Sequence, residues 1–249
     1  MDGESALPAL VTLAAPCIGS FVAAIGDRLP QGRTLILDRS RCESCATQLR
    51  WHELIPIWSW ISQRGKCRHC GARIGWPALF VELCALALAI WALLVLPSAA
   101  VLPAVAFGWT LLLLAILDFK TMRLPDAITL PLLVAGLIAA AILAPTRITD
   151  HLLGAVLGYA GMALLAVAYE TVRGRVGLGG GDAKLFAAIG AWIGWQGLPS
   201  VLLISGIAGI AYALLRGRGR LRAHDCIPFG PSLAAGGWIV WVHGPLVLS

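Results

Sequence analysis

The chain has 249 residues, of which 59% are hydrophobic and 13% are charged, and its formal net charge is +6. A soluble domain of this length needs about a quarter of its residues charged to cover its surface, so the composition excludes a wholly soluble protein. The mean hydropathy of +0.83 indicates that lipid solvates much of the chain.

The expected elements are almost all helices. Windows of about 20 mainly apolar residues, the length that crosses the hydrocarbon core of a bilayer, predict an all-α polytopic membrane protein of about eight transmembrane helices. The first window lacks a basic n-region and a cleavage site, which predicts a retained span within residues 1–25. Glycines blur the edges of two later windows, so seven or nine spans also fit. The eight windows begin near Pro8, Pro77, Ala99, Ala127, His151, Ala183, Pro199 and Gly230.

Lysine and arginine fall on alternate connections between these windows. Nine of the 19 lie between Arg28 and Arg73, and only Arg147 lies on the opposite side from the rest. The positive-inside rule then predicts a multi-pass protein with both ends outside and its long polar segment in the cytoplasm. The net charge follows from this topology and does not indicate a nucleic-acid partner, although arginines at such a surface can also hold anionic membrane lipid.

The polar segment at residues 26–76 carries four of the seven cysteines. Cys42 and Cys45 form one C-x-x-C pair, and Cys67 and Cys70 form a second pair after 21 intervening residues. This spacing is typical of a tetrahedral zinc ribbon. Four thiolates leave no open ligand position, so the expected Zn²⁺ is structural rather than catalytic. The alternative is four unrelated surface thiols.

These patterns divide the chain into three parts. We expect a first transmembrane helix at residues 1–25, a cytoplasmic zinc-binding domain at residues 26–76 and a transmembrane bundle at residues 77–249. His69 lies inside the second C-x-x-C pair and is expected to be a bystander, because four cysteines already fill the metal's shell. Gly71 is expected to help the turn after that pair to close.

Two of the few acidic residues stand at the edge of an apolar window. Asp118 ends the third window, where a carboxylate opposes the helix dipole, and this placement suggests a functional role. Asp182 follows the glycines at 179–181, which permit unusual backbone geometry and the close approach of a substrate strand. Two neighbouring carboxyls suit peptide hydrolysis, since one can be ionised to activate water while the other stays protonated and binds the scissile carbonyl. The alternative for Asp182 is an N-cap.

Other acidic residues have more ordinary interpretations. Asp126 follows Pro125 and is expected to cap the next helix. Glu82 and Glu170 are expected to pair with arginines at the same surface.

Together, these residues form an ordered set of motifs that resembles the type IV prepilin peptidases, a family of membrane aspartyl proteases of the GxGD kind. The resemblance covers about residues 19–238, nearly the whole chain. Each motif alone is weak, and the ordered set is specific. In chain order, the motifs are Gly19-Ser20-Phe21 with Arg28-Leu29-Pro30, the two C-x-x-C pairs, Ile55-Pro56, Val81-Glu82, Asp118 with Leu124-Pro125-Asp126, Gly179-Gly180-Gly181-Asp182-Ala183-Lys184-Leu185 and Ile227-Pro228-Phe229-Gly230-Pro231.

The resemblance implies that Asp118 and Asp182 are the catalytic pair of a prepilin peptidase in the bacterial inner membrane. It also implies the substrates, which are type IV prepilins or type II secretion pseudopilins, cleaved at the cytoplasmic membrane face. The family's second activity is N-methylation of the new amino terminus, with S-adenosylmethionine as the donor. The residues expected to form the substrate-binding loop are Gly179, Gly180, Gly181, Lys184, Pro125 and Asp126.

Departures from the family pattern lie away from the two aspartates. Val22-Ala23-Ala24 stands where relatives carry Asn after Gly-Ser-Phe-Leu. A Glu-Asn-Ile-Pro element reads Glu53-Leu54-Ile55-Pro56, and an Arg-Tyr-Pro element reads Pro77-Ala78-Leu79. We therefore expect that peptidase activity is kept and that methylation is weak or absent.

A different class of function also fits the paired carboxylates. Aspartates in membrane helices carry protons or ions in transporters, so an ion- or proton-coupled transporter or a zinc-stabilised membrane scaffold is the alternative. Transporters often show repeated halves, and no internal repeat is found here. A basic leader would meet a basic face, where Asp38, Glu43, Glu53 and Glu82 are the acidic contacts. The oligomeric state does not follow from the sequence.

Overall fold

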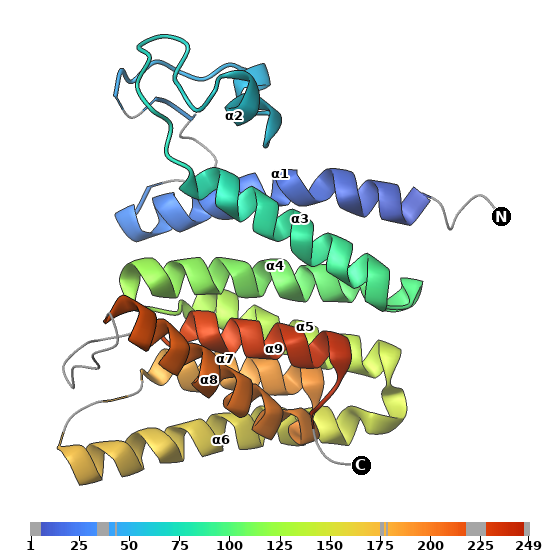
Figure 1. Cartoon of the computed structure of the whole chain (residues 1–249). Helices are drawn as coiled ribbons and strands as arrows, with labels where there is room; N and C mark the ends of the chain where they lie inside the picture. The colour runs from blue at the N-terminus through green and yellow to red at the C-terminus, as the bar shows by residue number, and fades with distance from the viewer. Residues whose placement is uncertain are drawn as a thin grey trace. The chain divides into compact units, whose positions relative to one another are not determined.

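The computed structural model is helical in nearly all its ordered elements (Figure 1), and its only β-structure among the described residues is two isolated bridges. The chain forms two compact units, Met1–Val101 and Leu102–Ser249. The three-part division at residues 25 and 76 stays a prediction. The described residues are 6–33, 40–42, 44–174, 177, 179–217 and 228–246.

The first unit is built on two apolar helices, α1 (Ala6–Arg28) and α3 (Pro77–Val95), which pack against each other. Their close approach depends on Gly19, because a Cβ atom there would lie 2.6 Å from Glu82 Cα. Along the chain, α1 and α3 are separated by the cysteine-bearing loops and by three short helices, η1 (Leu29–Gln31), η2 (Trp51–Leu54) and α2 (Trp58–Ser62).

The second unit contains most of α4 and all later helices, and the chain folds back and forth along it. The C-terminal ends of α4, α6 and α8 lie at one end of this unit, and the α5–α6 turn lies at the other (Figure 1). The helices are α4 (Ser98–Thr121), α5 (Asp126–Leu143), η3 (Pro145–Arg147), α6 (Ile148–Arg173), α7 (Gly180–Ile193), η4 (Trp195–Gly197), α8 (Leu198–Arg216) and α9 (Gly230–His243).

All eight apolar windows form helices, but only six helices in the described part of the chain are long and apolar enough to cross a membrane. The two shorter ones, α7 and α9, have 14 residues each. At 1.5 Å per residue each is about 21 Å long, less than the hydrocarbon thickness of about 30 Å. The protein is therefore a polytopic membrane protein, and two of its predicted spans are short internal helices.

Helix α7 is apolar because protein rather than lipid surrounds it. It packs against α5, α6 and α9, and most of its residues are buried. Gly154 of α6 and Gly190 of α7 meet so closely that a side chain at either would collide with the other's backbone. Trp192 stacks on Phe107 with 4.6 Å between ring centroids, and its indole N–H donates to Leu132 O at 2.8 Å. These contacts fix the C-terminal half of α7, and through it the helix that carries Asp182.

Candidate active site

Asp118 lies in the last turn of α4 and is only 5% exposed. Its Oδ2 accepts a hydrogen bond from the backbone N–H of Gly230, at 2.8 Å. Gly230 is the first residue of α9, so the carboxyl lies at the positive end of that helix dipole. The unfavourable position at the end of α4 is therefore offset by a favourable position at the start of α9.

Gly230 leaves no room for a side chain. A Cβ atom at this position would lie 2.7 Å from Asp118 Oδ2 and 2.9 Å from its Cγ. The residue belongs to the last of the family motifs, but the sequence alone assigned it no role. The sequence signal for this role was the position of Gly230 one residue before Pro231. Proline favours the first turn of a helix, so it indicates where α9 begins and where its backbone N–H groups are free to bind a carboxyl.

Asp182 is the third residue of α7 and is 9% exposed. Its Oδ2 accepts a hydrogen bond from the backbone N–H of Gly179, at 3.2 Å. The alternative weighed for Asp182, an N-cap, does not hold, because Gly179 is the N-cap and Asp182 binds the helix start from within the first turn. Such a bond orients the carboxyl and leaves its second oxygen for other partners.

Both aspartates line one cavity of about 560 Å³ in the second unit. The other lining residues come from the α4–α5 connection and from the start of α7. Two carboxyls that line one cavity repel each other when both are ionised, which disfavours the doubly charged state. The residues predicted to form the substrate-binding loop all line this cavity: Gly179, Gly180, Gly181, Lys184, Pro125 and Asp126.

The three glycines before Asp182 have different structural roles. Gly179 is extended, with φ −75° and ψ 145°, and none of the three has a positive φ, so the expected unusual backbone geometry is absent. Gly181 approaches Leu124 closely, since a Cβ would lie 3.0 Å from Leu124 Cβ. Gly180 faces open space, because a Cβ added there would have no neighbouring atom within 4 Å. Close approach therefore explains Gly181, whereas neither packing nor a positive φ requires glycine at position 180.

Asp126 and Lys184 form an ion pair at this cavity. Lys184 Nζ lies 2.6 Å and 2.8 Å from the two carboxylate oxygens of Asp126. The predicted helix cap was wrong, because Asp126 is the first residue of α5 and its side chain binds a lysine 58 positions later. Their side chains are 55% and 36% exposed, so the pair is weak and screened by solvent.

The turn after α4 brings further residues to the cavity that the sequence alone did not single out. Met122 has φ 53°, and its N–H donates to Asp118 O at 2.8 Å. This left-handed residue ends α4 and directs Arg123 and Leu124 along the cavity wall. Glycine is the usual residue for that conformation, so a methionine at this position gave no sequence signal for the turn.

The first unit holds the four clustered cysteines. Their Sγ atoms all lie within 4.8 Å of one another, and Cys42 Sγ and Cys70 Sγ are 3.8 Å apart. A tetrahedron with Zn–S bonds of about 2.3 Å has S–S edges of about 3.8 Å, so the thiols fit a tetrahedral metal ion. The prediction that these four residues form one cluster is confirmed, and His69 is not in it.

The two C-x-x-C turns are built alike. The N–H of Cys42 donates to Thr47 O at 2.9 Å, and the N–H of Cys67 donates to Ala72 O at 2.8 Å. Hydrogen bonding with Thr47 lowers the pKa of the Cys45 thiol to about 6, which favours the thiolate that binds metals. Gly71 closes the second turn with φ 70°, as expected, and Ala46 takes the equivalent place in the first with φ 55°.

Two buried glutamates tie this segment together. Glu53 accepts a hydrogen bond from Arg50 N–H at 2.8 Å, and its Oε1 lies 3.9 Å from His69 Nε2. The Arg50 amide is the main cause that lowers the pKa of Glu53. Glu82 accepts a hydrogen bond from Ile57 N–H at 2.7 Å, where an arginine partner was expected. The partner predicted for Glu170 stays a prediction.

Comparisons with known proteins find two matching family models. The family model described as "Type IV leader peptidase family" matches residues 105–214, and that of the "Bacterial Peptidase A24 N-terminal domain" matches residues 13–96. Each match falls within one of the two compact units. No solved structure gives a significant match.

Similar proteins of several bacteria carry the name prepilin leader peptidase/N-methyltransferase. That of Burkholderia pseudomallei (strain 1026b) is 42% identical over 213 residues, which are 85% of this chain and 69% of that protein. That of Aeromonas salmonicida (strain A449) is 39% identical over 214 residues, 84% of this chain and 73% of its own. That of Dichelobacter nodosus is 37% identical over 223 residues, 89% and 77% of the two chains.

Proposed function

This chain belongs to the type IV leader peptidase family, and we propose that it is a membrane aspartyl endopeptidase with Asp118 and Asp182 as its catalytic pair. Its substrates are type IV prepilins or type II secretion pseudopilins, from which it removes the leader peptide. The observation that carries the assignment is that the two buried carboxyls line one cavity at the end of the second unit.

The chemistry needs one ionised and one protonated carboxyl. The ionised carboxylate takes a proton from a water molecule, whose oxygen attacks the carbonyl carbon of the scissile peptide. The protonated carboxyl donates a hydrogen bond to the carbonyl oxygen as negative charge develops there. When the C–N bond breaks, the leaving nitrogen takes the proton that the first carboxyl had accepted.

The hydrogen bonds of the two aspartates favour one assignment of these roles. Asp118 accepts the shorter amide hydrogen bond, 2.8 Å from Gly230, at the positive end of α9. Asp182 accepts a longer one, 3.2 Å from Gly179. A hydrogen bond to the charged form favours that form, so Asp118 is the base and Asp182 carries the proton in the resting site.

The cavity wall offers two means of holding a substrate. The open side of Gly180 lets an extended peptide approach the backbone and borrow its hydrogen bonds. Asp126, half exposed beside Lys184, can bind a basic residue of the leader. Two of the acidic contacts considered from the sequence, Glu53 and Glu82, already have internal partners. The other two, Asp38 and Glu43, lie outside the described residues.

We place the protein in the bacterial inner membrane with the cavity on the cytoplasmic side. Lys120 in the last turn of α4, Arg123 in the α4–α5 connection and Arg216 at the end of α8 lie at the cavity end. Arg147 lies in the turn at the opposite end. Basic residues at the cavity end support a cytoplasmic active site. The zinc-binding segment is cytoplasmic by the same charge rule.

The four cysteines are proposed to hold a structural Zn²⁺ ion. The similar bridges Arg41–Gln48 and Lys66–Arg73 close the two loops and present the thiols in pairs. When bound, the ion cross-links loops too small to form a large core. All four ligands come from the chain, so the ion has no place in the peptidase reaction.

Methylation is a separate proposal. The names of the similar proteins include N-methyltransferase, whereas this chain departs from the family motifs at Val22-Ala23-Ala24, Leu54 and Pro77-Ala78-Leu79. We propose that its methylation of the new amino terminus is weak or absent. Mature pilin incubated with purified protein and S-adenosylmethionine should stay unmethylated by mass spectrometry, and a stoichiometric gain of one methyl group would overturn this.

Cleavage of a prepilin leader by purified protein in detergent tests the main proposal. Asp118→Asn and Asp182→Asn should each lose at least about 10³-fold in kcat with zinc content unchanged. The matched control is Asp150→Asn. Asp150 lies in the first turn of α6, at the end of the unit opposite the cavity, and its carboxylate accepts a hydrogen bond from Trp195. If the wild type cut no prepilin, the transporter or scaffold alternative would move ahead.

A further inference from the structure

The segment at residues 51–62 exposes an unusual amount of apolar surface. Trp51 is 79% exposed and Trp58 is 65% exposed, and Ile61 and Leu54 are also exposed. Trp76, which directly precedes α3, is 66% exposed. Soluble proteins rarely expose such a group of large apolar side chains without a partner. This segment belongs to neither the cysteine cluster nor the aspartate cavity.

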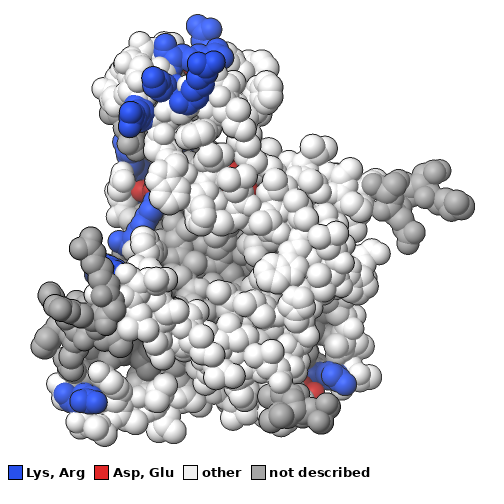
Figure 2. Space-filling view, viewed as in Figure 1, with Lys and Arg blue, Asp and Glu red and all other residues white. Residues whose placement is uncertain are grey.

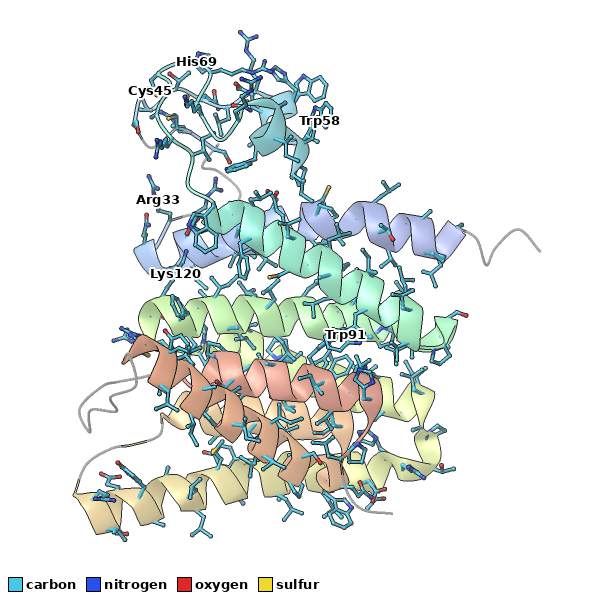
Figure 3. All side chains as sticks on the ribbon, viewed as in Figure 1. Arg33, Cys45, Trp58, His69, Trp91 and Lys120 are labelled. Carbon is cyan, nitrogen blue, oxygen red and sulfur yellow. The ribbon has the colours of Figure 1, made fainter. Side chains whose placement is uncertain are left out.

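A hydrogen bond sets the position of this segment along α3. Ile57 N–H donates to Glu82, which is five residues, or about 7.5 Å along the axis, after the first residue of α3. Figure 3 shows Trp58 on the side of the domain toward which α3 runs, whereas Cys45 lies on the opposite side. The segment therefore lies beside the second turn of α3, a helix long and apolar enough to cross a membrane.

The charge of the surrounding surface is complementary to one class of lipid. Residues 26–76 contain nine lysines and arginines against four aspartates and glutamates. Figure 2 shows lysine and arginine atoms gathered on the surface of this domain. A cavity of about 790 Å³ adjoins the apolar segment, and its lining includes the polar residues Arg28, Ser40, Arg50 and His52 and the apolar residues Trp51 and Leu54.

We propose that residues 51–62 insert into the membrane interface beside α3, and that their partner is anionic phospholipid. Tryptophan and isoleucine enter the boundary between headgroups and acyl chains, the usual location of tryptophan in membrane proteins. Arg28 and Arg50 bind the phosphate group of a lipid at the adjoining cavity. The cysteine-bearing loops are thereby held against the bilayer and do not extend freely into solvent.

Photocrosslinking in the full-length, zinc-loaded protein tests this location. A benzophenone amino acid replaces Trp58, and the protein is reconstituted in nanodiscs of equal phosphatidylethanolamine and phosphatidylglycerol. After irradiation, intact-mass analysis should find lipid adducts about fivefold more often than with the same group in place of His69. His69 is an exposed residue at the end of the domain far from α3 (Figure 3).

Two results would overturn the location. Equal and low adduct yields at the two positions would mean that the segment lies in water. A covalent dimer from position 58 would mean that a second copy of the chain covers it. Neither readout requires peptidase activity, so failure of this inference is distinct from failure of the proposed function.

A pair of arginine variants tests the lipid class. With the crosslinker at position 58, Arg50→Gln should lower the preference for phosphatidylglycerol adducts by about fivefold, because one basic contact near the surface is lost. Arg64→Gln, which removes an equal charge from an exposed site outside the cavity, should leave the preference unchanged. An unchanged preference in Arg50→Gln would contradict the anionic partner.

Discussion

The cysteine cluster and the aspartate cavity are assembled in different ways. Each C-x-x-C turn closes over a few residues, as in the bond from Cys42 N–H to Thr47 O, and four neighbouring thiols complete the cluster. The cavity instead depends on helix ends far apart in sequence. Asp118 and its hydrogen-bond donor Gly230 are separated by 112 positions.

This difference separates what local chemistry specifies from what packing specifies. The cysteine turns define their geometry by spacing alone, so the cluster requires little from the helices around it. The carboxyls acquire their environment only when α4, α7 and α9 are packed together. We therefore expect damage to the first site to stay local, and damage to the second to follow from changes at distant helix contacts.

The largest effect is expected from removal of a zinc ligand. Cys42→Ser should lose bound zinc and destabilise residues 40–76 by several kcal/mol, because metal binding contributes about 10 kcal/mol or more to small zinc domains. Hydrogen exchange should show lost protection there and retained protection in residues 102–246. Cys17→Ser, a thiol of α1 outside the cluster, should keep its zinc. Full zinc content in Cys42→Ser would contradict the four-thiolate site.

A methyl group at the cavity should affect catalysis while the rest of the fold persists. Gly230→Ala places a Cβ 2.7 Å from Asp118 Oδ2, so the carboxyl must move away from its amide donor. We expect about a 10²-fold loss of kcat in the prepilin cleavage assay, since displacement by about 1 Å has this cost. Gly206→Ala in α8, where nothing lies within 4 Å, should cleave normally. Normal cleavage by Gly230→Ala would show that catalysis does not depend on the contact between Gly230 and Asp118.

The ion pair at the cavity should influence substrate binding more than stability. Asp126→Asn should raise KM for a basic leader about threefold, whereas Lys184→Met should lower it by freeing the carboxylate. Melting temperatures of both should change little, because exposed pairs contribute about 0–1 kcal/mol. Steady-state kinetics at low salt measures KM for both variants. A shift of KM in the same direction in both variants would remove Asp126 as the leader contact.

The smallest effect is expected from the turn at Ala46. Ala46→Gly should stabilise the metal-loaded domain by about 0.5 kcal/mol, because alanine at φ 55° is strained by about 1 kcal/mol and glycine partly offsets this gain by its entropy when unfolded. Ala72→Gly, at a position without positive φ, should destabilise it. Chelator titration followed by hydrogen exchange measures the change in stability of both variants. The same sign for the two variants would contradict the strain at Ala46.

Much of the fold could be predicted from hydropathy, since all eight apolar windows are helices. The count of spans could not, because an apolar helix enclosed by protein looks like one enclosed by lipid. Helix α7 is the example, with Gly190 pressed against α6 and Trp192 stacked on Phe107. The short length of α7 was the only local signal that it does not span a membrane, and the glycines at its edge made that length hard to read from the sequence.

The candidate site followed the same division. The ligand set Cys42, Cys45, Cys67 and Cys70 could be predicted from spacing. The partners of the aspartates could not, because Gly230 donates to Asp118 only after α9 has packed beside α4. Asp126 was expected to cap its own helix, and a lysine from another helix binds its side chain instead. Local propensity cannot anticipate such tertiary partners.

A comparison of single and double variants tests most directly whether the two aspartates act as one unit. The kcat for prepilin cleavage would be measured for Asp118→Asn, Asp182→Asn and the double variant, each with confirmed zinc content and folding. If the pair is one catalytic unit, the double variant should lose no more than about the larger single loss, because members of such a unit are strongly non-additive. Losses that multiply in the double variant would show that the two carboxyls act independently, and would contradict the shared site proposed here.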